Sequence, residues 1–168
     1  YGSKPNNLHV PAQRFEDQFG ESVYIIEADS EKLRSESGKG VSHRYRRSNA
    51  KHTLAANFST VTQLHDSHTQ MIVHWAGEGS DVIIALSRDS RSGEGTSSNL
   101  FISRDYGKSF ANVTGQFRIP SGKQVVIDHY FNSKRRNSRY IFTDITNNYI
   151  FATTDYGQSF IPYQLEFR

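Results

Sequence analysis

Short runs of apolar and β-branched residues recur along the chain after residue 54, separated by polar turns. The runs are rich in Val, Ile, Phe and Tyr, and Gly, Asn, Asp or Ser residues bound each of them. No helical period of useful length runs through this part of the chain. The pattern predicts short strands at 71–75, 82–86, 100–103, 124–128, 140–143 and 149–153. Many short strands separated by turns are typical of an all-β sandwich, barrel or propeller.

An internal repeat favours the propeller among these folds. Leu100–Phe110 matches Ile150–Phe160 at an offset of 50 residues, and six of the eleven positions are identical. A repeat of about 40–50 residues with about four strands in each unit is typical of propeller blades. We therefore expect part of a β-propeller, with about two four-stranded blades over residues 64–115 and 120–168.

The repeated motif has the form Ser/Thr-x-Asp-x-Gly-x-Ser-Phe and is known as an Asp box. In such a turn the Asp accepts hydrogen bonds from nearby backbone N–H groups, and the Gly adopts a positive φ. Each motif offers one carboxylate, whereas a calcium site needs several converging oxygens. We therefore predict a structural role, without catalysis or metal binding, for Ser103, Asp105, Gly107, Ser109, Phe110, Thr153, Asp155, Gly157, Ser159 and Phe160.

The N-terminal third is mostly polar and lacks the regular apolar runs of the rest of the chain. Residues 1–20 and 29–53 are polar, and only Ser22–Glu27 between them is typical of a strand. We expect residues 1–47 to be mostly unstructured and the β-rich part to begin at residue 48. The boundary carries Arg44-Tyr-Arg46-Arg47 before Ser48, a pattern that furin-like convertases cut. Two N-glycosylation sequons follow, at Asn57 and Asn112.

Composition excludes several kinds of site. The chain has 168 residues and no Cys, which excludes a disulfide scaffold, a Cys zinc site and a thiol nucleophile. His65, Asp66 and His68 lie close together, but no neighbouring residue completes a zinc site, so we expect a surface turn there. We predict no metal and no cofactor, and no apolar run reaches the roughly 18 residues of a membrane span.

The basic excess of the chain is small and local. The net charge is +3, and one cluster of basic residues lies in the second repeat. This distribution does not predict a nucleic-acid surface, which would need a basic stripe along one face. We expect the cluster to form a solvated basic loop between the first two strands of the second blade, with contact to acidic ligands as an alternative role; its residues are Lys134, Arg135, Arg136 and Arg139.

Two groups of proteins use Asp boxes, and the residues around the first box resemble one of them. The stretches 64–78, 81–90, 98–110 and 138–144 are similar to the sortilin-type receptors, which carry a Vps-ten domain. The resemblance is strongest to the members that also carry low-density-lipoprotein-receptor repeats, and it covers about 64–165 well.

The resemblance implies a non-enzymatic receptor segment. Residues 1–47 would be a propeptide removed by a furin-like convertase, and 48–168 would begin the Vps-ten propeller. The partners would be peptide or protein ligands and the receptor's own propeptide. The whole protein would be a type I transmembrane sorting and endocytic receptor of the Golgi, endosome and cell surface, with this segment lumenal and its membrane span beyond this sequence.

Two alternatives remain open from the residues alone. A sialidase-like glycoside hydrolase also contains Asp boxes, but its Arg-Ile-Pro motif precedes the blades, whereas Arg118-Ile119-Pro120 lies between the two boxes here. A purely structural propeller repeat protein would explain the boxes and leave the convertase pattern unexplained.

Overall fold

The computed structural model describes residues 8–38, 57–90 and 96–166 and has an all-β fold, as predicted. Short strands make up most of the regular structure, with one α-helix and one 3-10 helix in these ranges. The elements are β1 (His9–Val10), β2 (Ala12–Glu16), β3 (Ser22–Asp29), α1 (Ser30–Gly38), β4 (Ser59–His65), β5 (Gln70–Trp75), β6 (Ile83–Arg88), β7 (Ser98–Ser103), β8 (Ala111–Asn112), η1 (Thr114–Gln116), β9 (His129–Asn132), β10 (Tyr140–Asp144), β11 (Tyr149–Thr153) and β12 (Ile161–Gln164).

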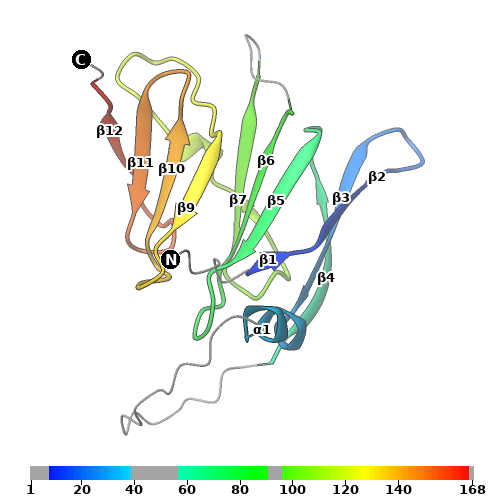
Figure 1. Ribbon diagram of the computed structural model, residues 1–168. Helices are drawn as coiled ribbons and strands as arrows, with labels where there is room; N and C mark the ends of the chain where they lie inside the picture. The colour runs from blue at the N-terminus through cyan, green and yellow to red at the C-terminus, as the bar shows by residue number, and fades with distance from the viewer. Residues whose placement is uncertain (1–7, 39–56, 91–95, 167–168) are drawn as a thin grey trace, which may run out of the picture.

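The strands form three antiparallel sheets that stand side by side (Figure 1). The first sheet has the order β2-β3-β4, the middle sheet β1-β5-β6-β7-β8, and the third sheet β12-β11-β10-β9. The two predicted repeats therefore each form one sheet, in which consecutive strands of the repeat are neighbours. Among the helices described, none is long and apolar enough to cross a bilayer.

The middle sheet is buried on both faces, and its central strand β6 shows why. Because side chains alternate along a strand, Ile83 and Ala85 share one face, and Ile84 and Leu86 share the other. The first pair packs in a core with the first sheet, and the second pair packs in a core with the third sheet. Such a strand shows as a continuous apolar run without polar alternation.

One predicted strand, 124–128, is an extended connector with no strand pairing. Val125 and Ile127 alternate into the core between the middle and third sheets, which explains the strand-like pattern. The N–H of Ile127, however, donates to Ser98 Oγ at 2.7 Å, and that of Val126 to Asp144 Oδ2 at 3.2 Å. Because these donors bond to side chains, no ladder forms, and the first strand of the sheet is β9 instead.

The strand predicted at Ser22–Glu27 is confirmed as part of β3, but the prediction that the rest of residues 1–47 is mostly unstructured is wrong for the described residues 8–38. Strand β3 lies between β2 and β4, and β1 extends the middle sheet by pairing His9 with His74 and Val10 with Val73. β2 is exposed and polar, so its order comes from backbone pairing with β3, which a hydrophobic pattern does not reveal. Arg44, Arg46, Arg47 and Ser48 lie outside the described residues.

The N-terminal elements also contribute to the core. Val10, Ile26 and Leu33 are almost fully buried and pack with Trp75 of the middle sheet. At the end of β3, Asp29 Oδ1 accepts hydrogen bonds from the N–H groups of Glu31 and Lys32, which caps α1. Strand β3 and helix α1 from this third of the chain therefore pack on one face of the middle sheet, which β1 extends at its edge.

Candidate functional site

Each Asp box is a closed turn in which the carboxylate is fully engaged. In the first box, Ser109 donates to Asp105 through its N–H at 3.0 Å and through its hydroxyl at 2.6 Å. Ser103 Oγ donates to Asp105 Oδ1 at 2.8 Å and accepts from the N–H of Gly107 at 2.8 Å. The two oxygens of Asp105 are therefore used in holding the turn.

The second box repeats this geometry. Ser159 donates to Asp155 at 3.0 Å and 2.6 Å, and Thr153 Oγ1 takes the role of the serine hydroxyl, donating to Asp155 at 2.7 Å. Partial burial alone would raise the pKa of Asp155, but the hydrogen bonds from Ser159, Thr153 and Gln158 lower that pKa to about 2. This carboxylate is ionised throughout the physiological range and is unsuited to general acid catalysis.

Both boxes connect one sheet to the sheet before it. The carbonyl of Tyr106 accepts a hydrogen bond from Thr60 Oγ1 on β4 at 2.9 Å, and the carbonyl of Tyr156 accepts one from Arg104 at 3.1 Å. Arg104 itself belongs to the first box. The first box therefore binds the first sheet, and the second box binds the middle sheet.

The turn backbone that makes these contacts includes a tyrosine as well as the glycine. Tyr106 and Tyr156 have φ values of 59° and 58°. Gly107 (φ 85°) and Gly157 (φ 76°) follow them and lie against the preceding sheet. The motif predicted a positive φ at the glycine but not at the tyrosine before it, because any residue can stand at that position of the motif.

Asp66 and His68 form a buried pair, so the prediction of a surface turn there is wrong. His68 Nδ1 lies 2.7 Å from Asp66 Oδ1, and His68 Nε2 lies 2.8 Å from Ser97 Oγ. Burial alone would raise the pKa of Asp66, but hydrogen bonds from Asn99 and His68 lower it. The hydroxyl of Tyr24 on β3 donates to the carbonyl of His68 at 2.6 Å. The N-terminal strand thus buries this turn.

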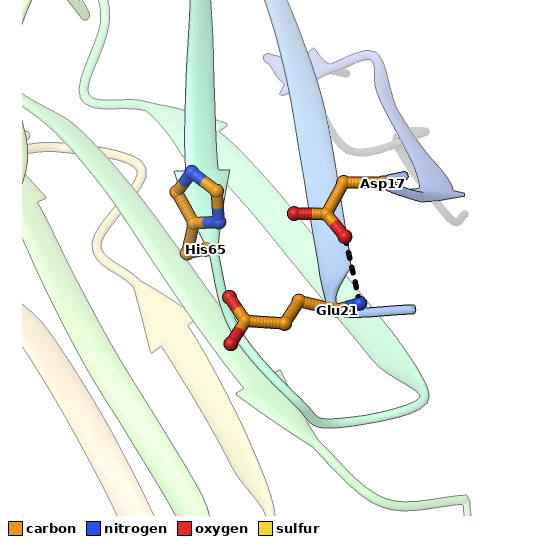
Figure 2. A group of neighbouring side chains, drawn as sticks. All are labelled: Asp17, Glu21 and His65. Atoms are coloured by element: carbon orange, nitrogen blue, oxygen red, sulfur yellow. Dashed lines mark hydrogen bonds between the residues drawn. The ribbon is translucent and has the colours of Figure 1, made fainter. Parts of the chain in front are cut away.

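His65 is exposed and lies near two carboxylates that the sequence places more than forty residues away. Figure 2 shows Asp17 and Glu21, from the β2–β3 hairpin, beside His65 at the end of β4. One potential ligand atom from each of the three side chains lies within 4.8 Å of the others. These side chains could offer three ligands to a divalent cation. Asp17 Oδ1 already accepts the N–H groups of Phe19 and Glu21, so closing the hairpin also explains its position.

The predicted basic loop is the exposed turn between β9 and β10, at the Asp-box end of the third sheet. Lys134, Arg135, Arg136 and Arg139 are all exposed there. Both sequon asparagines are exposed too: Asn57 precedes β4 and accepts a hydrogen bond from Arg34, and Asn112 lies in the edge strand β8.

A cavity of about 300 Å³ lies at the opposite end of the middle and third sheets. Its walls include Arg88 at the end of β6, Asp128 just before β9, and Ile145 in the turn after β10. No sequence motif marks it, because its residues come from four separate segments.

The outward face of the third sheet carries an exposed apolar row. Phe131 pairs with Ile141, which pairs with Ala152, which pairs with Ile161. The exposed fractions are 60% for Phe131, 41% for Ile141 and 53% for Ile161. The equivalent face of the middle sheet, which includes Ile84 and Ile102, is covered by the third sheet.

Comparison with known proteins finds relatives among receptors. The mouse sortilin-related receptor is 41% identical over 108 residues, which are 62% of this chain and 5% of that protein. The human sortilin-related receptor gives the same values, and the human VPS10 domain-containing receptor SorCS3 is 29% identical over 104 residues, 60% of this chain and 8% of that protein. The chain thus spans a small part of these relatives. No protein-family model matches it.

Proposed function

We propose that the chain belongs to the sortilin family of VPS10 domain receptors, to whose members it is similar, and that it forms part of the ligand-binding propeller of a sorting receptor. The receptor would bind peptides and proteins and carry them between the Golgi, the cell surface and endosomes. This segment would be lumenal or extracellular. It would bind its ligands without transforming them.

The observation that carries the proposal is the repeated contact between successive sheets. Each Asp box binds the preceding sheet through the carbonyl of its tyrosine, Tyr106 or Tyr156. A contact that repeats in the same sense from sheet to sheet generates a ring or a solenoid. The exposed row Phe131–Ile141–Ala152–Ile161 is where a further blade would pack.

Uptake of an antibody by living cells tests the receptor function without knowledge of the ligand. Cells that express the protein are labelled in the cold with an antibody raised against this chain and are then warmed. We expect the antibody to move from the surface into vesicles that carry endosomal markers, whereas an antibody against a non-internalising surface protein stays outside. Absence of the protein from the cell surface, or antibody that stays there on warming, would contradict the proposal.

We also propose that residues 1–47 are a propeptide released by a furin-like convertase after Arg47. Strand β3 pairs with β4 over seven residues, Val23–Asp29 with Ser59–His65, and β1 pairs with β5. These contacts cross the cleavage position, so cutting would leave the propeptide bound by strand addition. The propeptide would then dissociate only when those strands separate.

Cleavage in solution tests this second proposal. After treatment with a furin-like convertase, the two fragments should elute together from a size-exclusion column in native buffer and separately in urea. The variant Arg47→Ala, which lacks the last Arg of the pattern, should stay uncut. A cut chain whose fragments separate in native buffer would show that the propeptide is not held in this way.

The exposed basic loop Lys134–Arg139 is the part of this segment that we propose for contact with acidic ligands. Replacing Arg135 and Arg136 by Gln should lower the salt concentration at which the chain elutes from heparin. The same change at Arg14 and Arg118, which lie on other exposed surfaces, is the matched control. An equal effect of both pairs would show that only net charge matters.

Asn57 and Asn112 are proposed glycosylation sites, which a mass shift on glycosidase treatment would detect.

A further inference from the structure

The cavity between the middle and third sheets has the size of a small ligand site and lies away from the Asp boxes. Its volume is about 300 Å³, and ligand pockets range over roughly 300–1,000 Å³. Arg88, in its wall, pairs with Ser98 at the start of β7, whereas the first box begins at Ser103, at the end of that strand. The cavity therefore opens at the end of the sheets opposite the boxes and the basic loop.

The guanidinium of Arg88 lines this cavity with part of its hydrogen-bonding capacity unused. Its Nη1 donates to the backbone carbonyl of Asp128 at 2.6 Å. Its Nε has no hydrogen-bond partner among the described residues and is shielded even from water, so a ligand in the cavity would reach the guanidinium through its other N–H groups. An arginine side chain carries five N–H donors, so donors remain for such a ligand. A ligand carboxylate is the group whose geometry best matches a guanidinium.

Two carboxylates line the same cavity and form no ion pair with Arg88 within the described residues. Asp89 accepts a hydrogen bond from the N–H of Thr69 at 3.3 Å, and Asp128 accepts one from the N–H of Ile145 at 2.7 Å. A simple anion would meet repulsion from both aspartates. A ligand that also carries a positive group would satisfy charges of both signs.

The remaining walls combine aliphatic side chains with four hydroxyls and the imidazole of His129. Val126 and Ile145 contribute aliphatic surface, and Ser97 contributes a hydroxyl. Ser97 Oγ lies 2.8 Å from His68 Nε2, and His68 Nδ1 lies 2.7 Å from Asp66 Oδ1. A hydroxyl oxygen has two lone pairs, so Ser97 Oγ can also accept an N–H from a ligand.

We propose that this cavity binds a free aliphatic α-amino acid. The carboxylate lies against Arg88, the ammonium group lies between Asp89, Asp128 and Ser97, and the aliphatic side chain packs on Val126 and Ile145. This site is separate from the peptide and protein binding proposed above and does not depend on it.

Calorimetric titration of the 168-residue chain with L-leucine tests the proposal, with two relatives of the ligand as controls. N-acetyl-L-leucine lacks the ammonium group and resembles a peptide C-terminus, whereas L-leucinamide lacks the carboxylate and resembles an N-terminus. We expect saturable binding of leucine and affinities at least about tenfold weaker for the other two, since each loses a charge-assisted hydrogen bond. No saturable binding of leucine, or equal binding of either control, would overturn the proposal.

Variants locate the site. Arg88→Met should weaken leucine binding by about tenfold or more, whereas Arg118→Met, at an exposed arginine outside the cavity, should not change it. Because Arg88 also bonds to the carbonyl of Asp128, Asp89→Asn serves as a second variant, with its fold checked by circular dichroism. Asp89→Asn should weaken leucine binding too. A folded Asp89→Asn chain with unchanged affinity would overturn the assignment.

Discussion

Each box glycine has two roles, because it adopts a positive φ in the turn and also packs against the preceding sheet. Gly157 has a φ of 76°, and a Cβ placed on it would lie 2.5 Å from Ile102 Cδ1 of the middle sheet. Gly20 has nearly the same φ, 78°, and no atom within 4 Å of a Cβ. A side chain at Gly157 or at Gly20 would therefore meet the same backbone strain, but only the one at Gly157 would collide with a neighbouring side chain.

Gly157→Ala should therefore be more destabilising than Gly20→Ala. The positive φ costs about 1–2 kcal/mol in both variants, and crowding against Ile102 adds about 1–3 kcal/mol in Gly157→Ala. Urea unfolding monitored by circular dichroism measures both. Equal losses would mean that the second box does not press on the middle sheet.

His74 should make stability depend on pH in the mildly acid range. Burial, with a smaller contribution from nearby His9, lowers its pKa from 6.5 to about 4. Between these two pKa values His74 is protonated in the unfolded chain and neutral in the folded chain. The free energy of unfolding is therefore highest above about pH 6.5 and falls as the pH drops toward 4. The loss amounts to about 3 kcal/mol.

The variant His74→Phe tests this pH dependence. It keeps an aromatic ring beside Tyr130 and Tyr140 and removes the buried ring nitrogen that has no partner. Its stability should vary less between pH 6.5 and 4 than that of the unaltered chain, while His129→Gln, at an exposed histidine, should leave the slope unchanged. The same slope in all three chains would contradict the assignment.

At the scale of elements, most strands could be predicted, and the exceptions have identifiable causes. The β10 and β11 ranges follow from β-branched and aromatic runs, whereas the 124–128 run is apolar because it fills a core between sheets. β2 has no apolar pattern because it is an exposed edge strand. The Asp boxes were predictable as turns, but the cavity and the Asp17–Glu21–His65 group depend on contacts between distant segments.

Strand β3 should contribute as much to stability as a core strand of the repeats. Ile26 is 1% exposed and packs under the middle sheet, whereas Ile25, on the opposite face, is only half-buried. Ile26→Ala should cost about 2–5 kcal/mol, and Ile25→Ala about 1 kcal/mol or less. Urea unfolding compares the two. A small loss for both would indicate that β3 does not belong to the core.

At the scale of the whole molecule, the outward face of the third sheet is apolar and is not covered by any of the described residues. The row Phe131–Ile141–Ala152–Ile161 corresponds to a face that is buried in the middle sheet. In a chain of 168 residues studied alone, this face and the unpaired strand edges should promote association. The surface proposed for packing against a further blade would then join copies of this chain.

Ile141→Lys should shift the isolated chain toward the monomer. The charge lies in the middle of the apolar row and would be desolvated in any contact made there. Val61→Lys places the same charge at a 71% exposed position on the first sheet and should leave the association state unchanged. Light scattering after size exclusion measures both. An oligomer that persists in Ile141→Lys would show that association occurs elsewhere.

The central claim is that residues 8–38 and the two repeat sheets form one folded body that would survive a cut after Arg47. Hydrogen exchange of the backbone amides, measured by mass spectrometry before and after convertase cleavage, tests it most directly. We predict that the amides of β3 exchange as slowly as those of β6 in both forms, because each strand is paired on both sides. Rapid exchange of β3 in the uncut chain would contradict the claim, and so would protection that is lost on cleavage.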